Sequence, residues 1–218
     1  MARRIELFPP GIPIRKRILD YVLTVPALII LSPVMLILAV VIWLQCGRPI
    51  FFCQTRPGYR GIPFRLCKFR TMRSTHDRAG NLLPDEERIT RFGRKLRSLS
   101  LDELPELIHV LRGEMSLVGP RPLLTQYLDR YSQEQARRHD VLPGITGWAQ
   151  VRGRNILAWP EKFRLDVWYV DHWNIALDLK ILLLTIGKVI KKEGINQPGH
   201  ATSPEFMGNE EKVFDERS

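Results

Sequence analysis

Cysteine is scarce in this chain, and no pattern of metal ligands accompanies it. The 218 residues include three cysteines, Cys46, Cys53 and Cys67, and an odd number argues against the disulfide framework of a small secreted domain. The three form no C-x-x-C pair, and no histidine stands at the spacing of a zinc site. We therefore predict three reduced packing cysteines in a cytosolic environment.

Other signatures are missing as well. The chain has no internal repeat, and no small-residue cleavage site follows its apolar stretch, which argues against a secretory signal peptide. The formal net charge is +10 and the sequence pI is about 9.9, so a partner should be anionic, as lipid headgroups, phosphorylated ligands and nucleic acids are. Because no helix-turn-helix, zinc-finger or RNP signature is present, we predict no nucleic-acid partner.

What the chain does have is one long apolar run. Residues 21–44 carry no charge, and about 20 apolar residues are enough to cross the roughly 30 Å core of a membrane. At the centre of the run, Pro33 cannot donate to the carbonyl of Ile29, and its ring disfavours an unbroken helix. The Ser32 hydroxyl is able to satisfy a freed backbone group. Each half, with roughly 12 residues, reaches only the middle of a bilayer.

Basic residues flank this run on both sides. Residues 15–17 are Arg-Lys-Arg, and residues 48–70 carry six further arginines and lysines. Cytoplasmic loops carry the excess of Lys and Arg, so a helix-break-helix that enters and leaves one leaflet, with its break at Ser32-Pro33, fits both flanks. We therefore predict a re-entrant membrane hairpin. The alternative is an ordinary kinked transmembrane anchor.

These features divide the chain into four parts. We expect an N-terminal extension at 1–13, the membrane hairpin at 14–47, a small cytoplasmic α/β domain at 48–195 and a tail at 196–218. The tail is rich in Gly, Pro and acidic residues and should be loosely ordered. The fold should be mostly α with minor β.

Within the domain, hydrophobic periodicity and turn residues predict the elements. A hairpin should join 51–54 to 63–70 around Arg56-Pro57-Gly58, helices should cover 86–96, 104–111, 123–140, 161–170 and 175–192, and loops should lie at 115–122 and 143–155. The last helix combines an apolar face with four lysines. That combination suits an amphipathic helix at the membrane interface, and it equally suits a core helix with solvated lysines.

Asp102 and Glu103 are the first candidates for chemistry. Ser100-x-x-Glu103 has the pattern of a capping box, which needs no catalysis to explain it. A helix that started at Ser100, however, would place Pro105 at its fifth position, where it removes a hydrogen bond. A start near Asp102 puts both carboxylates at a helix N-terminus, which keeps a carboxylate ionised as a nucleophile or Mg²⁺ ligand must be. From the residues alone both interpretations stay open.

Candidates for phosphate binding surround this dipeptide in the sequence. Arg97 ends a basic stretch just before it, and Arg121 is held between two prolines. A guanidinium fixed in this way suits bidentate binding of phosphate. A solvated surface explains most of these cations, but it explains the rigid frame of Arg121 less well. The loop at 143–150 combines turn glycines with Trp148 and Gln150, which fits recognition of a base or sugar and equally fits packing of a buried Trp.

Three longer motifs carry a resemblance to a known family. They are RSLSLDELPEL at 97–107, GEMSLVGPRP at 113–122 and PGITGWAQVRGRN at 143–155, and KFRTM at 68–72 and the Ser32-Pro33 break agree with them. In these motifs the chain resembles the bacterial sugar transferases, the monotopic phosphoglycosyl transferases, over roughly residues 14–195. Its short length and the stretch RNILAW at 154–159 are most similar to the small members of this family that act in bacterial protein N-glycosylation.

The resemblance implies an enzyme that moves a sugar 1-phosphate from a UDP-sugar to undecaprenyl phosphate and releases UMP. It would work at the cytoplasmic face of the bacterial inner membrane, among anionic phospholipids. Asp102 would be the nucleophile, forming a phosphosugar–aspartyl intermediate, and also a ligand of Mg²⁺, with Glu103 as the second member of the dyad. The expected donor is UDP-N,N'-diacetylbacillosamine or a related N-acetylated sugar. The alternative, a non-catalytic basic scaffold on the membrane surface, leaves the three motifs unexplained.

The same resemblance suggests further site residues. Arg97 and Arg121 would bind phosphate, with Lys68 and Arg70 as weaker candidates. The candidate loop for the nucleotide or sugar comprises Trp148, Gln150, Arg154 and Asn155. Glu106 stands where the family commonly has Gln, and its added charge would serve the metal only if the side chain faces the site.

Overall fold

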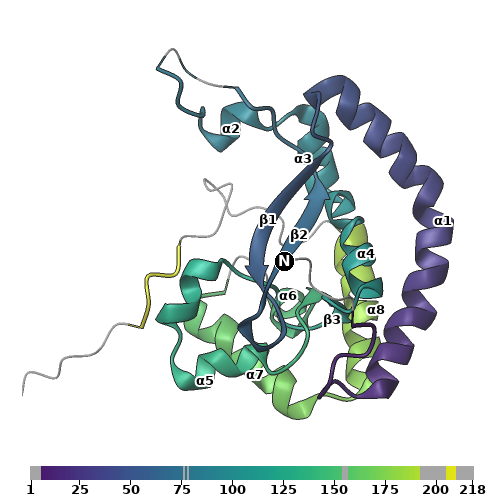
Figure 1. Ribbon diagram of the computed structural model, residues 1–218, viewed down its shortest axis with the longest axis vertical. Helices are drawn as coiled ribbons and strands as arrows, with labels where there is room; N and C mark the ends of the chain where they lie inside the picture. Colours follow the sequence, from purple (N-terminus) through teal and green to yellow (C-terminus); the bar gives the residue numbers. More distant parts are fainter. Residues whose placement is uncertain (1–5, 76, 78, 154–156, 192–204, 210–218) are drawn as a thin grey trace, which may run out of the picture.

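The fold is mostly helical with two small sheets, as predicted, and the computed structural model describes residues 6–75, 77, 79–153, 157–191 and 205–209 (Figure 1). The helices are α1 (Ile14–Cys46), α2 (Asp85–Arg88), α3 (Arg91–Ser98), α4 (Glu106–Leu111), α5 (Gln133–Ala136), α6 (Trp148–Arg152), α7 (Trp159–His172) and α8 (Ile175–Lys191). The strands are β1 (Phe51–Pro57), β2 (Pro63–Phe69), β3 (Ser116–Val118) and β4 (Gly144–Thr146). Short 3₁₀ helices lie at η1 (Tyr59–Gly61), η2 (Leu101–Glu103), η3 (Thr125–Arg130) and η4 (Arg137–His139).

The N-terminal apolar run forms one helix rather than two. α1 continues through Pro26 and Pro33, and Figure 1 shows it as an arc whose two ends turn toward the rest of the chain. The expected break at Ser32-Pro33 was therefore wrong at the level of secondary structure. The helix continues because the Ser32 hydroxyl donates to the Ile29 carbonyl (2.9 Å), to which Pro33, having no N–H, cannot donate. The sequence had indicated this role for Ser32.

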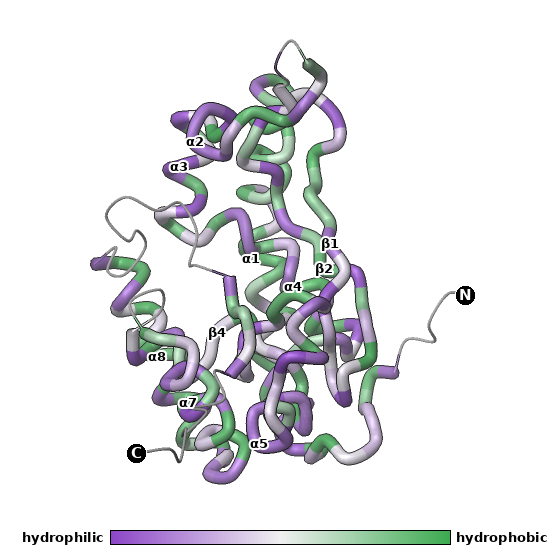
Figure 2. The backbone as a smooth tube through the Cα atoms, turned by 90° about the vertical axis from the view of Figure 1, so that its left-hand side faces the viewer, coloured by the Kyte–Doolittle hydropathy of each residue, from purple (hydrophilic) through white to green (hydrophobic). Residues whose placement is uncertain are grey.

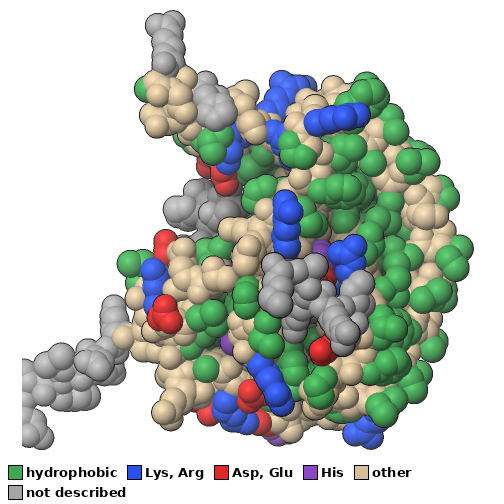
Figure 3. All heavy atoms as spheres, in the orientation of Figure 1, with side chains coloured by type: hydrophobic (Ala, Val, Ile, Leu, Met, Phe, Trp, Pro, Cys, Tyr) green, Lys and Arg blue, Asp and Glu red, His purple; other side chains and the backbone are tan. Residues whose placement is uncertain are grey.

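Most apolar side chains in the middle of α1 are exposed. By length and composition this helix is sufficient to cross a membrane, and Figure 3 shows hydrophobic side chains gathered along the edge that it forms. The large exposed ones include Val22, Val25, Ile29, Ile30, Val34, Leu36, Ile37 and Val40. Toward the C-terminal end, by contrast, Leu38 and Ile42 pack with Phe69 of β2 and Leu96 of α3.

The start of α1 is fixed to the domain by a buried ion pair. Lys16 is 6% exposed, and its Nζ lies 2.6 Å from Oδ2 of Asp178 on α8 and 2.9 Å from the carbonyl oxygen of Val118 on β3. Tyr169 of α7 donates to Oδ1 of Asp178 (2.8 Å), and the Trp173 indole donates to Oδ2 (3.0 Å). One carboxylate therefore holds together side chains from three helices and the loop between α7 and α8.

The next residue of α1 binds the helix that follows the candidate dipeptide. Arg17 is fully buried; its Nη1 donates to Asp20 (2.9 Å) and its Nη2 donates to the Val110 carbonyl in the last turn of α4 (2.7 Å). Arg17 thus adds a side-chain donor to the Val110 carbonyl, which also accepts from the backbone N–H of Gly113 (3.1 Å). Because Lys16 and Arg17 are both buried, Arg15 is the only exposed residue of the basic flank at 15–17.

The sheet of β3 and β4 contains the glycine-rich motifs, and the strands of the β1–β2 sheet line a pocket. β1 and β2 form the predicted hairpin, whereas β3 and β4 pair in parallel within segments that we expected to be loops. A Cβ on Gly144 would lie 2.1 Å from the backbone nitrogen of Gly119, so this close pairing requires glycine. Periodicity alone did not predict the pairing because each strand has only three residues.

Two predicted helices were wrong in extent. The segment 86–96 is divided into α2 and α3 at Ile89, which is extended (φ −70°, ψ 122°) and forms a bridge with Met72. The segment 123–140 consists of η3, α5 and η4, because Tyr131 is extended (φ −76°, ψ 139°) and Ser132 starts α5 with a capping box. The helices expected at 161–170 and 175–192 are confirmed as α7 and α8; α8 mixes hydrophobic and hydrophilic residues along its length (Figure 2).

The prediction of three reduced cysteines was wrong for two of them. Cys53 and Cys67 form a disulfide, and Cys46 is free. The hairpin register places the pair directly opposite, with Cα atoms 4.1 Å apart, and the Cys67 N–H donates away from β1 to His109 (3.1 Å). In an antiparallel hairpin, two opposed residues that exchange no backbone hydrogen bonds have closer side chains than a hydrogen-bonded pair has. Only the register makes these cysteines neighbours, so sequence spacing gave no signal.

Part of the predicted tail is packed on the domain. Phe206 is 3% exposed in an aromatic cluster with Tyr127 and Phe163, and Arg130 donates to Glu205 (2.8 Å). The expectation of loose order was therefore wrong for residues 205–209, because an apolar ring finds a buried position there. The rest of that segment, 196–204 and 210–218, lies outside the described residues.

Replacing Asp178 by Asn should destabilise the protein by about 3–5 kcal/mol, because the Lys16 charge would stay buried without its counter-charge. Thermal and denaturant unfolding in detergent micelles, followed by Trp fluorescence, measures the loss. Asp171→Asn is the matched control: its carboxylate pairs with Arg137 at the surface, where ion pairs contribute about 0–1 kcal/mol. Equal losses in the two variants would contradict the structural role of the buried pair.

Candidate active site

The two candidate carboxylates begin a helical segment. η2 contains Asp102 and Glu103, and Leu104 and Pro105 keep helical dihedral angles up to the start of α4. Ser100 is left-handed (φ 54°) and its side chain makes no capping hydrogen bond. The capping-box interpretation was therefore wrong, and the helical start near Asp102 is confirmed.

Asp102 is a buried carboxylate beside a cation. It is 4% exposed, and its Oδ2 lies 4.0 Å from Nζ of Lys68 on β2. Burial, followed by the charge of Glu103, raises the pKa of Asp102 above its usual range, while Lys68, Arg97 and Arg121 lower it. From the sequence, the helix N-terminus was expected to favour the ionised form of Asp102. Burial instead favours its protonated form.

Arg121 lies against Glu103 and is fixed at its backbone. The two side chains form an ion pair, and the charge of Glu103 is the main reason that the pKa of Arg121 is raised. The Arg121 carbonyl accepts from Nη2 of Arg138 (2.8 Å), and the same Nη2 lies 2.7 Å from the buried Asp166. The rigid frame predicted from the flanking prolines is thus reinforced by a buried ion pair from α7 and η4.

The remaining predicted cations divide into two groups. Lys68 lines the pocket, and burial lowers its pKa despite the nearby Asp102. Arg97, on the last turn of α3, donates to Thr71 (3.0 Å) and acts electrostatically on Asp102. Arg70 instead donates to the backbone carbonyls of Met72 (2.8 Å) and Arg48 (3.2 Å), so it holds the chain after β2 and is not among the residues that line the pocket.

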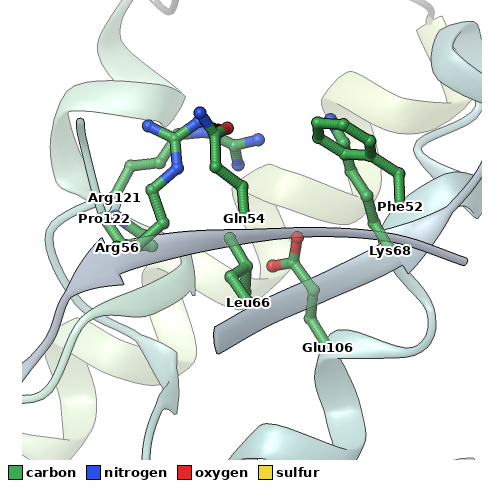
Figure 4. A pocket seen from close by; sticks show the side chains of 8 residues that line it. All are labelled: Phe52, Gln54, Arg56, Leu66, Lys68, Glu106, Arg121 and Pro122. Atoms are coloured by element: carbon green, nitrogen blue, oxygen red, sulfur yellow. Dashed lines mark hydrogen bonds between the residues drawn. The ribbon is translucent and has the colours of Figure 1, made fainter. Parts of the chain in front are cut away.

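A pocket opens along one face of the hairpin (Figure 4). Its lining consists of Phe52, Gln54, Arg56, Leu66, Lys68, Glu106, Arg121 and Pro122. The five hairpin residues alternate along β1 and β2, as the period of two requires for side chains on a single face. Sequence reasoning missed Gln54 and Arg56, although this alternation, once the register is known, identifies both.

Glu106 faces the pocket from α4, between the strand residues in Figure 4. It is 2% exposed. Burial, reinforced by the charge of Glu103, raises its pKa to about 8. At neutral pH the side chain is therefore a protonated carboxyl with one donor and one acceptor, which resembles the Gln expected at this position more than it resembles a carboxylate.

Two of the loop residues expected to recognise the nucleotide or sugar, Trp148 and Gln150, are not among the residues that line the pocket. Trp148 is 6% exposed and stacks on Trp168 of α7 with ring centroids 5.3 Å apart, as the packing interpretation expected. Gln150 donates to the Ile145 carbonyl (3.0 Å). Residues 154–156, which include Arg154 and Asn155, lie outside the described residues.

A divalent cation would find few protein ligands here. Among the described residues no group of three or more His, Cys, Asp or Glu side chains is placed to hold a metal. Mg²⁺ needs only one or two carboxylates when substrate phosphates and waters complete its octahedron. Asp102 therefore fits a cation that arrives with a diphosphate, and it does not fit a permanent all-protein site.

Comparison with known proteins identifies similar chains. Residues 13–192 match the family model described as bacterial sugar transferase. The uncharacterized sugar transferase EpsL of Bacillus subtilis (strain 168) is 55% identical over 196 residues, which are 90% of this chain and 97% of that relative. The UDP-glucose:undecaprenyl-phosphate glucose-1-phosphate transferase of Caulobacter vibrioides is 40% identical over 190 residues, 83% of this chain and 71% of the relative. The galactosyl transferase CpsE of Streptococcus agalactiae is 40% identical over 195 residues, 83% of this chain and 43% of the relative.

The pKa of Glu106 predicts a pH-dependent stability. Without Mg²⁺, the free energy of unfolding should fall as pH rises from about 4.5 to about 8, because folded Glu106 keeps a proton that the unfolded chain has lost. Its contribution to the slope is at most about 1.4 kcal/mol per pH unit. Glu106→Gln should remove this contribution, and Glu134→Gln, at an exposed carboxylate of α5, should not. Denaturant unfolding from pH 5 to pH 8.5 measures the slopes; an unchanged slope in Glu106→Gln would contradict the assignment.

Proposed function

Because the chain belongs to the bacterial sugar transferase family, we propose that it moves a sugar 1-phosphate from a UDP-sugar to undecaprenyl phosphate and releases UMP. Membership makes the chain a transferase, and the Caulobacter relative is named for this reaction with UDP-glucose. One observation carries the proposal: the carboxylate of Asp102 is buried beside Lys68 and within electrostatic reach of Arg97 and Arg121. Such a group of cations is suited to a substrate diphosphate.

The reaction proceeds in two halves through Asp102. A carboxylate oxygen of Asp102 attacks the β-phosphorus of the UDP-sugar, and the bond from that phosphorus to the bridging oxygen breaks, so UMP leaves with the electron pair. An oxygen of undecaprenyl phosphate then attacks the phosphosugar–aspartyl phosphorus and restores the carboxylate. One phosphoanhydride replaces another, so the exchange needs no further source of energy.

The neighbouring residues serve charge and position in this scheme. Lys68 and Arg97 offset the charge that gathers on the phosphoryl oxygens, and they favour the ionised form of Asp102 against its burial. Arg121 binds phosphate as a planar fork, and Glu103 holds that fork when no substrate is present. Mg²⁺, carried by the diphosphate and ligated by Asp102, supplies further neutralisation when bound.

The membrane arrangement follows from α1. Its basic start and its apolar end both pack on the same domain, while the exposed side chains between them suit lipid tails. These contacts support the proposal that α1 enters and leaves the cytoplasmic leaflet, with Ser32-Pro33 inside it, and that α8 lies at the interface among anionic headgroups. The acceptor phosphate then meets the site at the surface of the inner membrane.

The donor sugar expected from the sequence is N-acetylated, with UDP-N,N'-diacetylbacillosamine first. Two relatives are named for glucose and galactosyl transfer, so a donor panel has to include UDP-glucose and UDP-galactose beside N-acetylated UDP-sugars. Release of UMP with undecaprenyl phosphate and Mg²⁺ identifies the donor. If no UDP-sugar of the panel leads to release of UMP, the result would instead favour a non-catalytic membrane scaffold.

Asp102 as a nucleophile predicts a burst without acceptor. Enzyme mixed with labelled UDP-sugar and Mg²⁺ should release close to one UMP per active site and retain the labelled sugar phosphate covalently. Asp102→Asn should abolish both signals, because an amide does not attack phosphorus, and Glu103→Gln should slow turnover strongly. Asp129→Asn, at an exposed carboxylate of η3, is the control. A wild-type enzyme that turns over but never carries label would refute the covalent route and leave the transferase assignment standing.

The re-entrant arrangement predicts that both chain ends lie in the cytoplasm. In a background without native cysteines, single cysteines near Met1 and Ser218 should resist an impermeant maleimide in intact cells and react after lysis. The reason is that α1 returns to the leaflet it entered. Labelling of one end alone in intact cells would show that α1 spans the membrane.

A further inference from the structure

Arg56 is a pocket cation whose charge no carboxylate in the described part of the chain neutralises through an ion pair. Its Nη2 donates to the Gln54 side-chain oxygen (2.8 Å), and its Nε is buried with no hydrogen-bond partner among the described residues. Arg56 is half-buried, and a cation that is partly removed from water without a counter-charge is costly. The buried Nε and the missing counter-charge point to a partner that is not part of the protein.

Other arginines that are buried, or that line the pocket, are paired with carboxylates. Arg17 pairs with Asp20, and Arg138 pairs with Asp166, in both cases with side chains nearly inaccessible to solvent. Arg121, which shares the pocket with Arg56, pairs with Glu103. Within the described residues, Arg17, Arg138 and Arg121 therefore each have a carboxylate partner, and Arg56 has none.

The surroundings of Arg56 make the imbalance larger. Burial, followed by the positive charge of Arg121, lowers the pKa of Arg56. Figure 4 shows Arg56 and Gln54 reaching the same part of the pocket as Arg121. Glu106, the carboxyl in the pocket lining, acts to raise the pKa of Arg56, but its own pKa of about 8 leaves it mostly protonated at neutral pH, so it offers little counter-charge.

We propose that Arg56, held by Gln54 on β1, binds a phosphoryl group of a substrate together with Arg121. This inference rests on the transferase function proposed above. A phosphoryl group supplies the missing negative charge and offers oxygens to two planar forks at once, which a single chloride does not. Gln54 fixes the orientation of the guanidinium, while Phe52, Leu66 and Pro122 in the lining reduce the access of water.

Two sources carry the same chemistry: the diphosphate of the donor and the monophosphate of the prenyl acceptor. Equilibrium binding distinguishes them without requiring turnover. The full chain in nanodiscs is titrated separately with UDP plus Mg²⁺ and with geranyl phosphate, a water-soluble prenyl monophosphate. The variants are Arg56→Gln, Arg56→Lys and the matched control Arg65→Gln, which removes the same charge from an exposed residue at the neighbouring position of the hairpin.

We expect Arg56→Gln to weaken one of the two ligands by about 10- to 100-fold, Arg56→Lys to recover part of the loss, and Arg65→Gln to bind as the wild type does. A loss confined to UDP assigns the donor diphosphate, and a loss confined to geranyl phosphate assigns the acceptor. Unchanged binding of both ligands in Arg56→Gln would overturn the proposal.

Stability separates binding from a structural role. Because Arg56→Gln removes a half-buried charge that has no ion pair, Tm should stay the same or rise. A lower Tm, with both ligands weakened alike and no recovery in Arg56→Lys, would show a structural role and overturn the proposal. Binding that depends on Arg56 in a protein that turns over no UDP-sugar would overturn the transferase function and leave this site standing.

Discussion

The buried start of α1 is the constraint on which the other parts of this protein depend. Lys16 is compensated by Asp178 of α8 and the Val118 carbonyl of β3, and Arg17 by Asp20 of α1 itself and by backbone carbonyls that include that of Val110. Val110 lies at the end of α4, so the helix proposed to enter the membrane also sets the position of the helix that carries Glu106. Movement of α1 relative to the domain would separate the Lys16 charge from Asp178 and remove the Val110 carbonyl from Arg17, and this couples the membrane segment to the site.

At the site itself, charge is concentrated rather than neutralised pair by pair. Asp102, Glu103 and Glu106 share a small volume with Lys68 and Arg121, and burial shifts the pKa of Asp102 and Glu106 upward. Each cation that offsets one carboxylate also repels its neighbouring cations, as Arg121 does to Arg56. An arrangement of this kind is costly in the empty protein and becomes favourable when a polyanion enters, which is the physical requirement for catalysis on a diphosphate.

Sequence reasoning succeeded where the information is local. The hairpin around Arg56-Pro57-Gly58, the helices near 161–170 and 175–192, and the helical start near Asp102 all follow from turn residues, periodicity and the intolerance of proline inside a helix. It failed at 123–140, where the charged pattern resembles a helix but Tyr131 is extended, so that 3₁₀ turns and one short helix replace it. Contacts with the aromatic cluster around Phe206 override propensity there.

By itself the sequence determined the family and the long apolar segment and singled out Asp102 and Glu103 as candidates, because motifs, hydrophobicity and proline sterics are properties of short segments. Only the tertiary structure decided that Lys16 and Arg17 are buried, that Cys53 meets Cys67, and that Gln54 and Arg56 share a pocket with Arg121. Each of these depends on strand register or on contacts between residues far apart in the chain. Burial then sets the charge state of Glu106, since the free energy of ionisation depends on the medium around a carboxyl more than on its neighbours in sequence.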